Sequence, residues 1–123
     1  MHSSPLQTEE ELLLVKEAAI LPYMFDVLER DIAMLRQAAL KLPEPYIARL
    51  QAAQNRVLER QLQLKQLFRQ GDIRIIEARR TEFSLQVEYK CRGYTHRMEL
   101  LWEIVRADIE IRLADELHID LNR

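Results

Sequence analysis

The chain has 123 residues, of which 48% are hydrophobic and 31% are charged, and its formal net charge is −2. This balance is typical of one folded domain and excludes a disordered chain. A single cysteine excludes an internal disulfide. Neither a signal-peptide pattern nor an apolar run of the roughly 20 residues that cross a bilayer is visible, so we expect a cytoplasmic protein with no membrane partner.

The first part of the chain is expected to form a tail over residues 1–7 and a helix at about 8–20. Thr8 precedes three glutamates, which is the pattern of a capping box with acids at the positive start of the helix dipole. Pro22 then either kinks one long helix or occupies the first turn of a new one. We favour a break or kink, which gives a second helix at about 22–42.

The second helix and the one after it are expected to pack lengthwise. The second helix has the heptad spacing of a helix packed along another, in residues Leu21, Phe25, Leu28, Ile32, Leu35, Ala39 and Leu42. Pro43 and Pro45 stop it, and a third helix with its own heptad seam follows at about 45–70. A short turn between helices of matched length predicts an antiparallel hairpin. Gln54 and Gln61 lie in the seam, where they either set the register or sit at an exposed edge, the interpretation that we favour.

Beyond Gly71, the expected end of the third helix, the period of the hydrophobic residues changes to two. Every second residue from Phe83 to Cys91 is hydrophobic, which is the pattern of a half-buried strand. We therefore expect a β-hairpin of two strands, at about 72–79 and 82–91.

The last helix is expected at about 96–117, with Thr95 as its cap. At about 100° per residue, its apolar residues form two stripes on roughly opposite sides. One stripe is Met98, Leu101, Trp102, Val105, Ile109 and Leu113, and the other is Leu100, Ile104, Ala107, Ile111 and Ala114. Such a helix is either central in the monomer or part of a subunit interface. The candidate oligomer face consists of Leu100, Ile104, Ala107 and Ile111.

These elements predict an α+β fold, mainly helical with a small β component, in which residues 8–123 form a single domain. An antiparallel helical hairpin comes first, and a two-stranded β-hairpin precedes the C-terminal helix. A lone two-stranded ribbon is marginal in water and exposes two edges. We therefore expect a homo-oligomer, and dimers with twofold symmetry are the commonest kind.

Charge is unevenly distributed along the chain. Residues 1–31 carry seven acids against two bases and residues 98–123 seven against three, whereas residues 32–97 carry six acids and thirteen bases. This pattern indicates either a binding face or internal complementarity between the ends and the middle, and we favour the second. Five cations around the expected β-hairpin form a candidate charged docking surface: Arg74, Arg79, Arg80, Lys90 and Arg92.

Side chains that carry chemistry are sparse. His96, Glu99 and Glu103 share one face of the expected last helix, close to Cys91, and are the best candidates for a divalent cation or a Cys–His nucleophile. The alternative, which we favour, is a solvated polar stripe. We therefore predict no catalytic residues, no metal site and no cofactor.

The function predicted from the sequence is that of a small non-enzymatic protein-interaction or regulatory protein, which acts as a homo-oligomer and binds an unidentified protein partner. A regulator that binds nucleic acid through the basic β-ribbon is one alternative, since such a ribbon can enter a major groove. The sequence pI near 5.9 argues against it. A metal-dependent enzyme is the other alternative.

Overall fold

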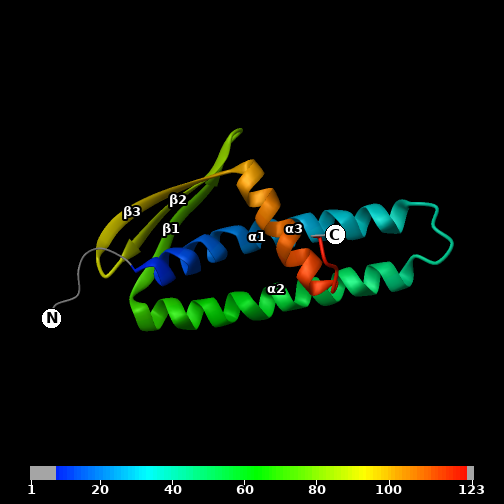
Figure 1. The fold of residues 1–123 in the computed structure, drawn as a ribbon, viewed down its shortest axis with the longest axis horizontal. Coiled ribbons are helices and arrows are strands. Elements are labelled where there is room, and N and C mark those ends of the chain that lie inside the picture. Colours follow the sequence, from blue (N-terminus) through cyan, green and yellow to red (C-terminus); the bar gives the residue numbers. More distant parts are fainter. Residues whose placement is uncertain (1–7, 122–123) are drawn as a thin grey trace.

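The structure is a computed structural model that describes residues 8–121 of the chain. Two helices precede a three-stranded antiparallel sheet and a third helix follows it, so the expected α+β class is confirmed (Figure 1). The elements are α1 (Glu9–Gln37), α2 (Glu44–Gly71), β1 (Ile73–Arg80), β2 (Ser84–Cys91), β3 (Tyr94–Leu101) and α3 (Trp102–Glu116). The first two helices form a long hairpin, with the sheet at one end and α3 across its middle (Figure 1).

Helix α1 runs unbroken through Pro22, so the expected break between two helices is wrong. Thr8 caps α1 as predicted: the amide of Glu11 donates to its Oγ1 at 3.0 Å, and its own amide donates to the Glu11 carboxylate at 2.9 Å. A proline inside a helix is unfavourable by about 3 kcal/mol. Leu21 and Met24, on either side of it, are buried in one core, and their burial outweighs the missing hydrogen bond.

Helices α1 and α2 pack antiparallel, but α1 ends at Gln37 and not near residue 42 as expected. Ala38 is already extended, with ψ of 151°, and residues 38–43 connect the two helices. The last two heptad residues, Ala39 and Leu42, are exposed and have no facing helix to pack on. An apolar spacing without a partner surface does not hold a helix together.

Gln54 is buried in the seam between α1 and α2, so its assignment to an exposed edge is wrong. Its Nε2 donates to Oε1 of Glu29 at 2.7 Å and to the carbonyl of Phe25 at 3.4 Å. Because both acceptors belong to α1, this amide helps to fix the register of the hairpin.

Residues 94–101 form the strand β3, where the structure differs most from the sequence-based prediction. Thr95 is therefore not a helix cap, and α3 begins only at Trp102. Strand β3 pairs antiparallel with β2, with Val87 opposite Met98, and β2 also pairs with β1. The expected two-stranded ribbon is thus a three-stranded sheet in the order β1-β2-β3.

The turn from β2 to β3 consists of Arg92 and Gly93, both with positive φ (51° and 86°). Two residues with positive φ are the geometry of a tight hairpin turn, which Gly93 adopts without strain. In the following segment, His96, Met98 and Leu100 alternate with polar residues, yet Met98 also fits a helical stripe with later residues. Periodicity alone therefore did not separate a strand from a helix here.

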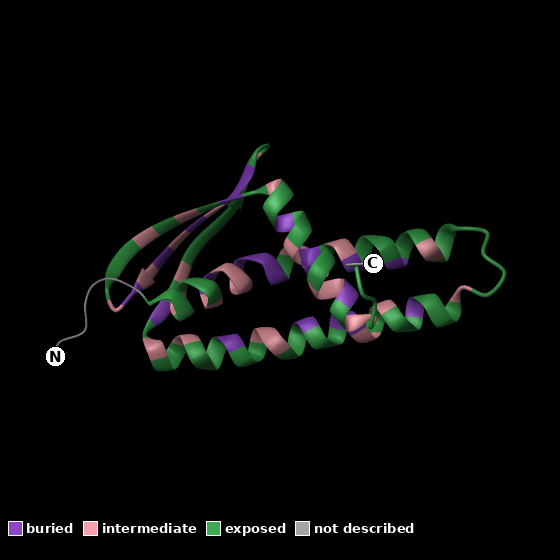
Figure 2. Ribbon diagram, in the orientation of Figure 1, coloured by how far each residue is buried: buried purple, intermediate pink, exposed green. Residues whose placement is uncertain are grey.

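The hydrophobic core lies between the inner face of the sheet, α1 and the facing side of α2 (Figure 2). Its largest fully buried side chains are Tyr89, Ile20, Met24, Leu28, Ile47, Leu85, Val15, Val87 and Val105. None of the described helices is long and apolar enough to cross a membrane.

Candidate interaction surface

Helix α3 is fixed at its start to the turn between β1 and β2. The indole Nε1 of Trp102 donates to the carbonyl of Thr81 at 2.7 Å, and its backbone amide donates to the carbonyl of Phe83 at 3.3 Å. The indole also packs on Tyr23 of α1, with ring centroids 4.9 Å apart. Val105, on the next turn, is fully buried. The direction of α3 is therefore set by its first two turns.

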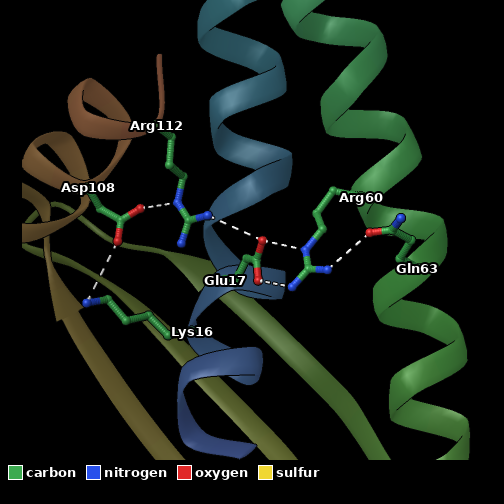
Figure 3. A network of polar contacts seen from close by, with 6 residues as sticks. All are labelled: Lys16, Glu17, Arg60, Gln63, Asp108 and Arg112. Carbon is green, nitrogen blue, oxygen red and sulfur yellow. Dashed lines mark hydrogen bonds and ion pairs between the residues drawn. The ribbon is translucent and has the colours of Figure 1, made fainter. Parts of the chain in front are cut away.

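A network of charged side chains joins α3 to both long helices (Figure 3). Arg60 of α2 donates two hydrogen bonds to the carboxylate of Glu17 on α1, at 2.7 and 2.9 Å. Arg112 of α3 reaches the same carboxylate at 3.3 Å. Burial raises the pKa of Glu17, but the hydrogen bonds and positive charges of Arg60 and Arg112 outweigh it and hold that pKa below its usual value.

The network continues along α3. Arg112 pairs with Asp108 one turn earlier, and Lys16 of α1 lies 3.9 Å from the same carboxylate (Figure 3). Near the end of α3, Arg56 of α2 lies 2.6 Å from the carboxylate of Glu116. These pairs all lie on the side of α3 that faces the helical hairpin, so they fix the rotation of α3 about its own axis.

The opposite side of α3 carries an apolar stripe that residues 8–121 leave uncovered. The α3 stripe consists of Ile104, Ala107 and Ile111; Ile104 is 46% exposed and Ile111 is 66% exposed. Leu100, the fourth residue of the expected oligomer face, is buried on β3, so its place in that face is wrong. The neighbouring Leu101, the last residue of β3, is 47% exposed.

The register divides the five cations of the predicted docking surface between the two faces of the sheet. Arg80 turns toward α1, where it lies 2.7 Å from Oδ2 of Asp26 and its guanidinium carbon is 5.1 Å from the centre of the Tyr23 ring. Arg92 also turns toward α1 and binds the carboxylate of Glu11. Both residues therefore anchor the sheet and do not extend a surface for a partner.

Arg74, Arg79 and Lys90 lie on the outer face of the sheet. Arg74 is opposite Lys90, and Arg79 donates to the amide oxygen of Gln86 at 2.8 Å. Three glutamates share this face with them: Glu77, Glu88 and Glu99. The outer face is consequently a mixture of both charges and not a continuous basic ribbon.

The thiol near the candidate metal-binding residues faces the core. Cys91 is buried, with its Sγ 3.7 Å from Oε1 of Glu11. Burial raises the pKa of this thiol, and the negative charge of Glu11 raises it further. A thiol in this state is a poor nucleophile.

The other candidates for metal binding do not share a helix face as expected, because two of them lie on a strand. His96 stacks on Tyr89, with ring centroids 5.3 Å apart, and its buried Nε2 has no hydrogen-bond partner in the described part of the chain. Glu99 lies on the outer face, where Ser84 donates to it at 2.7 Å, and Glu103 lies in the first turn of α3. Within residues 8–121, no three His, Cys, Asp or Glu side chains are placed to hold a metal ion.

The uneven charge along the chain is matched by ion pairs between its ends and its middle. In the described residues these pairs are Glu11–Arg92, Glu17–Arg60, Asp26–Arg80 and Arg56–Glu116. Internal complementarity, the interpretation favoured from the sequence, accounts for them. The network around Glu17 was not predicted, because the net charges of whole sequence segments do not identify which side chains meet.

Comparison with known proteins gives one finding about family. The family model described as YhjD protein matches residues 6–121. No curated protein and no solved structure matches the chain.

Proposed function

The chain belongs to the YhjD protein family, and we propose that it is a small non-enzymatic protein-interaction module that dimerises through the outer side of α3. The observation that carries this proposal is the α3 stripe. Its apolar side chains point away from the hairpin because the ion pairs of Arg112, Asp108 and Glu116 hold the other side of the helix inward. An apolar surface held rigidly outward is typical of an interface.

The stripe has the spacing and charges of an antiparallel contact between two copies of α3. With the twofold axis near the small side chain of Ala107, Ile104 of one copy lies beside Ile111 of the other. The same arrangement brings Arg106 close to Glu110 of the second copy; both are exposed in the single chain. Opposite charges at the rim of an apolar contact favour this orientation over a parallel one.

A non-enzymatic role is supported by the way in which the reactive groups are used. The carboxylates of Glu11 and Glu17 each bind an arginine that holds two elements together. The thiol of Cys91 is buried against the same Glu11. We also propose a cytoplasmic location, where a lone thiol stays reduced.

Light scattering on the peak eluting from a size-exclusion column tests the proposal. At concentrations between about 1 and 100 µM, we expect twice the chain mass of 14.7 kDa. The double variant Ile104→Glu/Ile111→Glu is expected to elute as a monomer with an unchanged circular dichroism spectrum.

The matched control is Leu58→Glu/Leu62→Glu, which changes two exposed apolar residues of α2 (46% and 62% exposed) and is expected to leave the dimer intact. A monomer mass for the unmodified chain over the whole range contradicts the proposal. So does a dimer that survives Ile104→Glu/Ile111→Glu.

A further inference from the structure

A groove runs between the C-terminal part of α2 and the first half of β1, on another part of the molecule than the α3 stripe. Its volume is about 600 Å³, which is within the size range of ligand clefts. We call it the edge groove. Its lining residues include Leu64, Lys65, Phe68, Arg69, Arg74 and Ile75.

The floor of the edge groove is apolar. Leu64 and Phe68 of α2 line one side, Ile73 and Ile75 of β1 line the other, and Ala18 of α1 contributes to the lining from the core. Leu64 and Ile73 are buried, whereas Phe68 and Ile75 are only partly covered. The floor therefore offers apolar surface to side chains of a partner.

The rim of the edge groove is basic. Lys65, Arg69 and Arg74 are all exposed, and no described residue forms an ion pair with any of them. Asp72 is the single acid among the described lining residues. Cations without a partner next to apolar surface favour a ligand that is both acidic and apolar.

The unpaired edge of β1 borders this groove. In the part of the chain that the structure describes, β1 pairs only with β2, and no residue of β2 or β3 lines the groove. The groove therefore lies on the side of β1 that has no neighbouring described strand. Strand β1 leaves directly from the end of α2 (Figure 1). An unpaired edge presents a row of backbone donors and acceptors that another peptide backbone can satisfy.

The bulge in β1 limits where such pairing takes place. The register shifts between Ile75 and Glu77, which interrupts the regular ladder of hydrogen bonds halfway along the strand. Pairing along the whole edge is thereby disfavoured, and the segment from Ile73 to Ile75, next to the apolar floor, remains regular.

We propose that the edge groove binds an extended peptide segment of a partner protein, with alternating apolar and acidic residues, as a fourth strand beside β1. Its apolar side chains would pack on Phe68 and Ile75, and its carboxylates would meet Lys65, Arg69 and Arg74. Nucleic acids and lipids also carry negative charge, but they have no peptide backbone to satisfy the edge of β1. This site and its partner go beyond dimerisation and do not depend on it.

A peptide-display selection on the immobilised full chain tests the proposal, because it lets the groove select its own ligand. A random library of peptides of about ten residues is expected to yield sequences that alternate apolar and acidic residues. A synthetic peptide from this selection is then titrated by fluorescence anisotropy against the chain and its variants. No enrichment, or enrichment of basic or proline-rich peptides, overturns the proposal.

Two variants with matched charge changes locate the peptide. Arg69→Glu/Arg74→Glu is expected to weaken binding by about tenfold or more, whereas Arg79→Glu/Arg97→Glu, on the outer face of the sheet, is expected to leave it unchanged. Circular dichroism of both variants checks that they fold. Equal weakening by both pairs indicates attraction by net charge alone and overturns the edge groove as the site.

Backbone methylation of the peptide tests strand addition itself. Methylation of every second amide removes either the donors that face β1 or the donors that face solvent. One of the two methylated isomers is expected to lose binding and the other to keep it. Equal binding of both isomers overturns strand addition. The same titration on Ile104→Glu/Ile111→Glu is expected to give unchanged affinity, so failure of the dimer and failure of the groove are distinguishable.

Discussion

Arg92 binds Glu11 through two parallel hydrogen bonds, with Nη1 2.7 Å from Oε2 and Nη2 3.0 Å from Oε1, although 81 residues separate them along the chain. The pair ties the first turn of α1 to the turn between β2 and β3. The Thr8 amide and the Cys91 thiol also donate to this carboxylate. The hydrogen bonds of Arg92 have the largest effect on the pKa of Glu11. They outweigh the opposing effect of burial and lower this pKa from its usual 4.5 to about 2.

This lowered pKa predicts a defined loss of stability in acid. The carboxyl group titrates at lower pH in the folded chain than in the unfolded chain, so its contribution is complete above pH 4.5 and is lost as the pH falls toward about 2. In urea unfolding, Glu11→Gln is expected to be less stable than the unmodified chain at pH 7, with a difference that shrinks below pH 4.5. Glu10→Gln, at an exposed position of the same turn, is the control. A difference independent of pH contradicts the prediction.

Pro22 predicts a substitution that stabilises the chain. It is exposed inside α1, where an α-helix would direct its missing amide to the carbonyl of Ala18. Pro22→Ala is expected to raise the free energy of unfolding by about 1–3 kcal/mol, because the restored hydrogen bond exceeds the greater freedom of the unfolded chain. Pro45→Ala is the control, since a proline in the first turn of α2 has no such penalty and little change is expected. A less stable Pro22→Ala contradicts the prediction.

The sequence predicted helices and strands correctly where the buried hydrophobic residues repeat with a single period over many positions. The heptads from Leu21 to Ile32 and from Ile47 to Leu64 predicted the helical hairpin, because both stripes meet a partner surface. Strand β2 was predicted for the same reason, since its alternating residues are buried on one face. The third strand was missed because residues 94–101 satisfy a period of two and also part of a helical stripe.

The candidate surface was predicted only in part. Ile104 and Ile111 were placed in a candidate oligomer face from their spacing, and both are exposed in the single chain. Leu100 was misplaced because the helix starts two residues after it. The pairing of Arg80 with Asp26 and the unpaired rim of the edge groove depend on contacts across the fold, which no local pattern contains.

The network around Glu17 predicts a strong effect from a small change. Glu17→Gln removes a charge from a side chain that is 13% exposed and leaves Arg60 and Arg112 without their shared carboxylate. The loss expected in urea unfolding is about 1–3 kcal/mol. A double-mutant cycle with Arg60→Met is expected to give a coupling energy of about 1 kcal/mol. Glu59→Gln, at an exposed position of α2, is the control, and an equal effect from both glutamates contradicts a role for the network.

The mixed charge of the outer sheet face predicts weak binding of nucleic acid. Arg80 and Arg92 are neutralised by acids of α1, and glutamates separate the remaining cations. Fluorescence anisotropy with short duplex DNA, single-stranded DNA and RNA is expected to show binding at low salt only. Binding that persists at near-physiological salt and weakens on Arg79→Ala/Lys90→Ala makes the nucleic-acid alternative the leading one.

The environment of Cys91 predicts a thiol that is inert in the folded chain. It is 1% exposed, and burial together with the charge of Glu11 raises the pKa of the thiol, so little thiolate forms near neutral pH. Alkylation by iodoacetamide at pH 8 is expected to be roughly a hundredfold or more slower than in urea, because the reagent reaches the sulfur only when the chain opens. The control is Cys91→Ser/Thr95→Cys, which moves the thiol to an exposed position of β3 and is expected to react at the rate of a free cysteine. If Cys91 reacts as fast as that control, the thiol is accessible in the folded chain and the prediction is wrong. Only a reaction faster than that of the control indicates an activated thiol and favours a Cys–His nucleophile with His96.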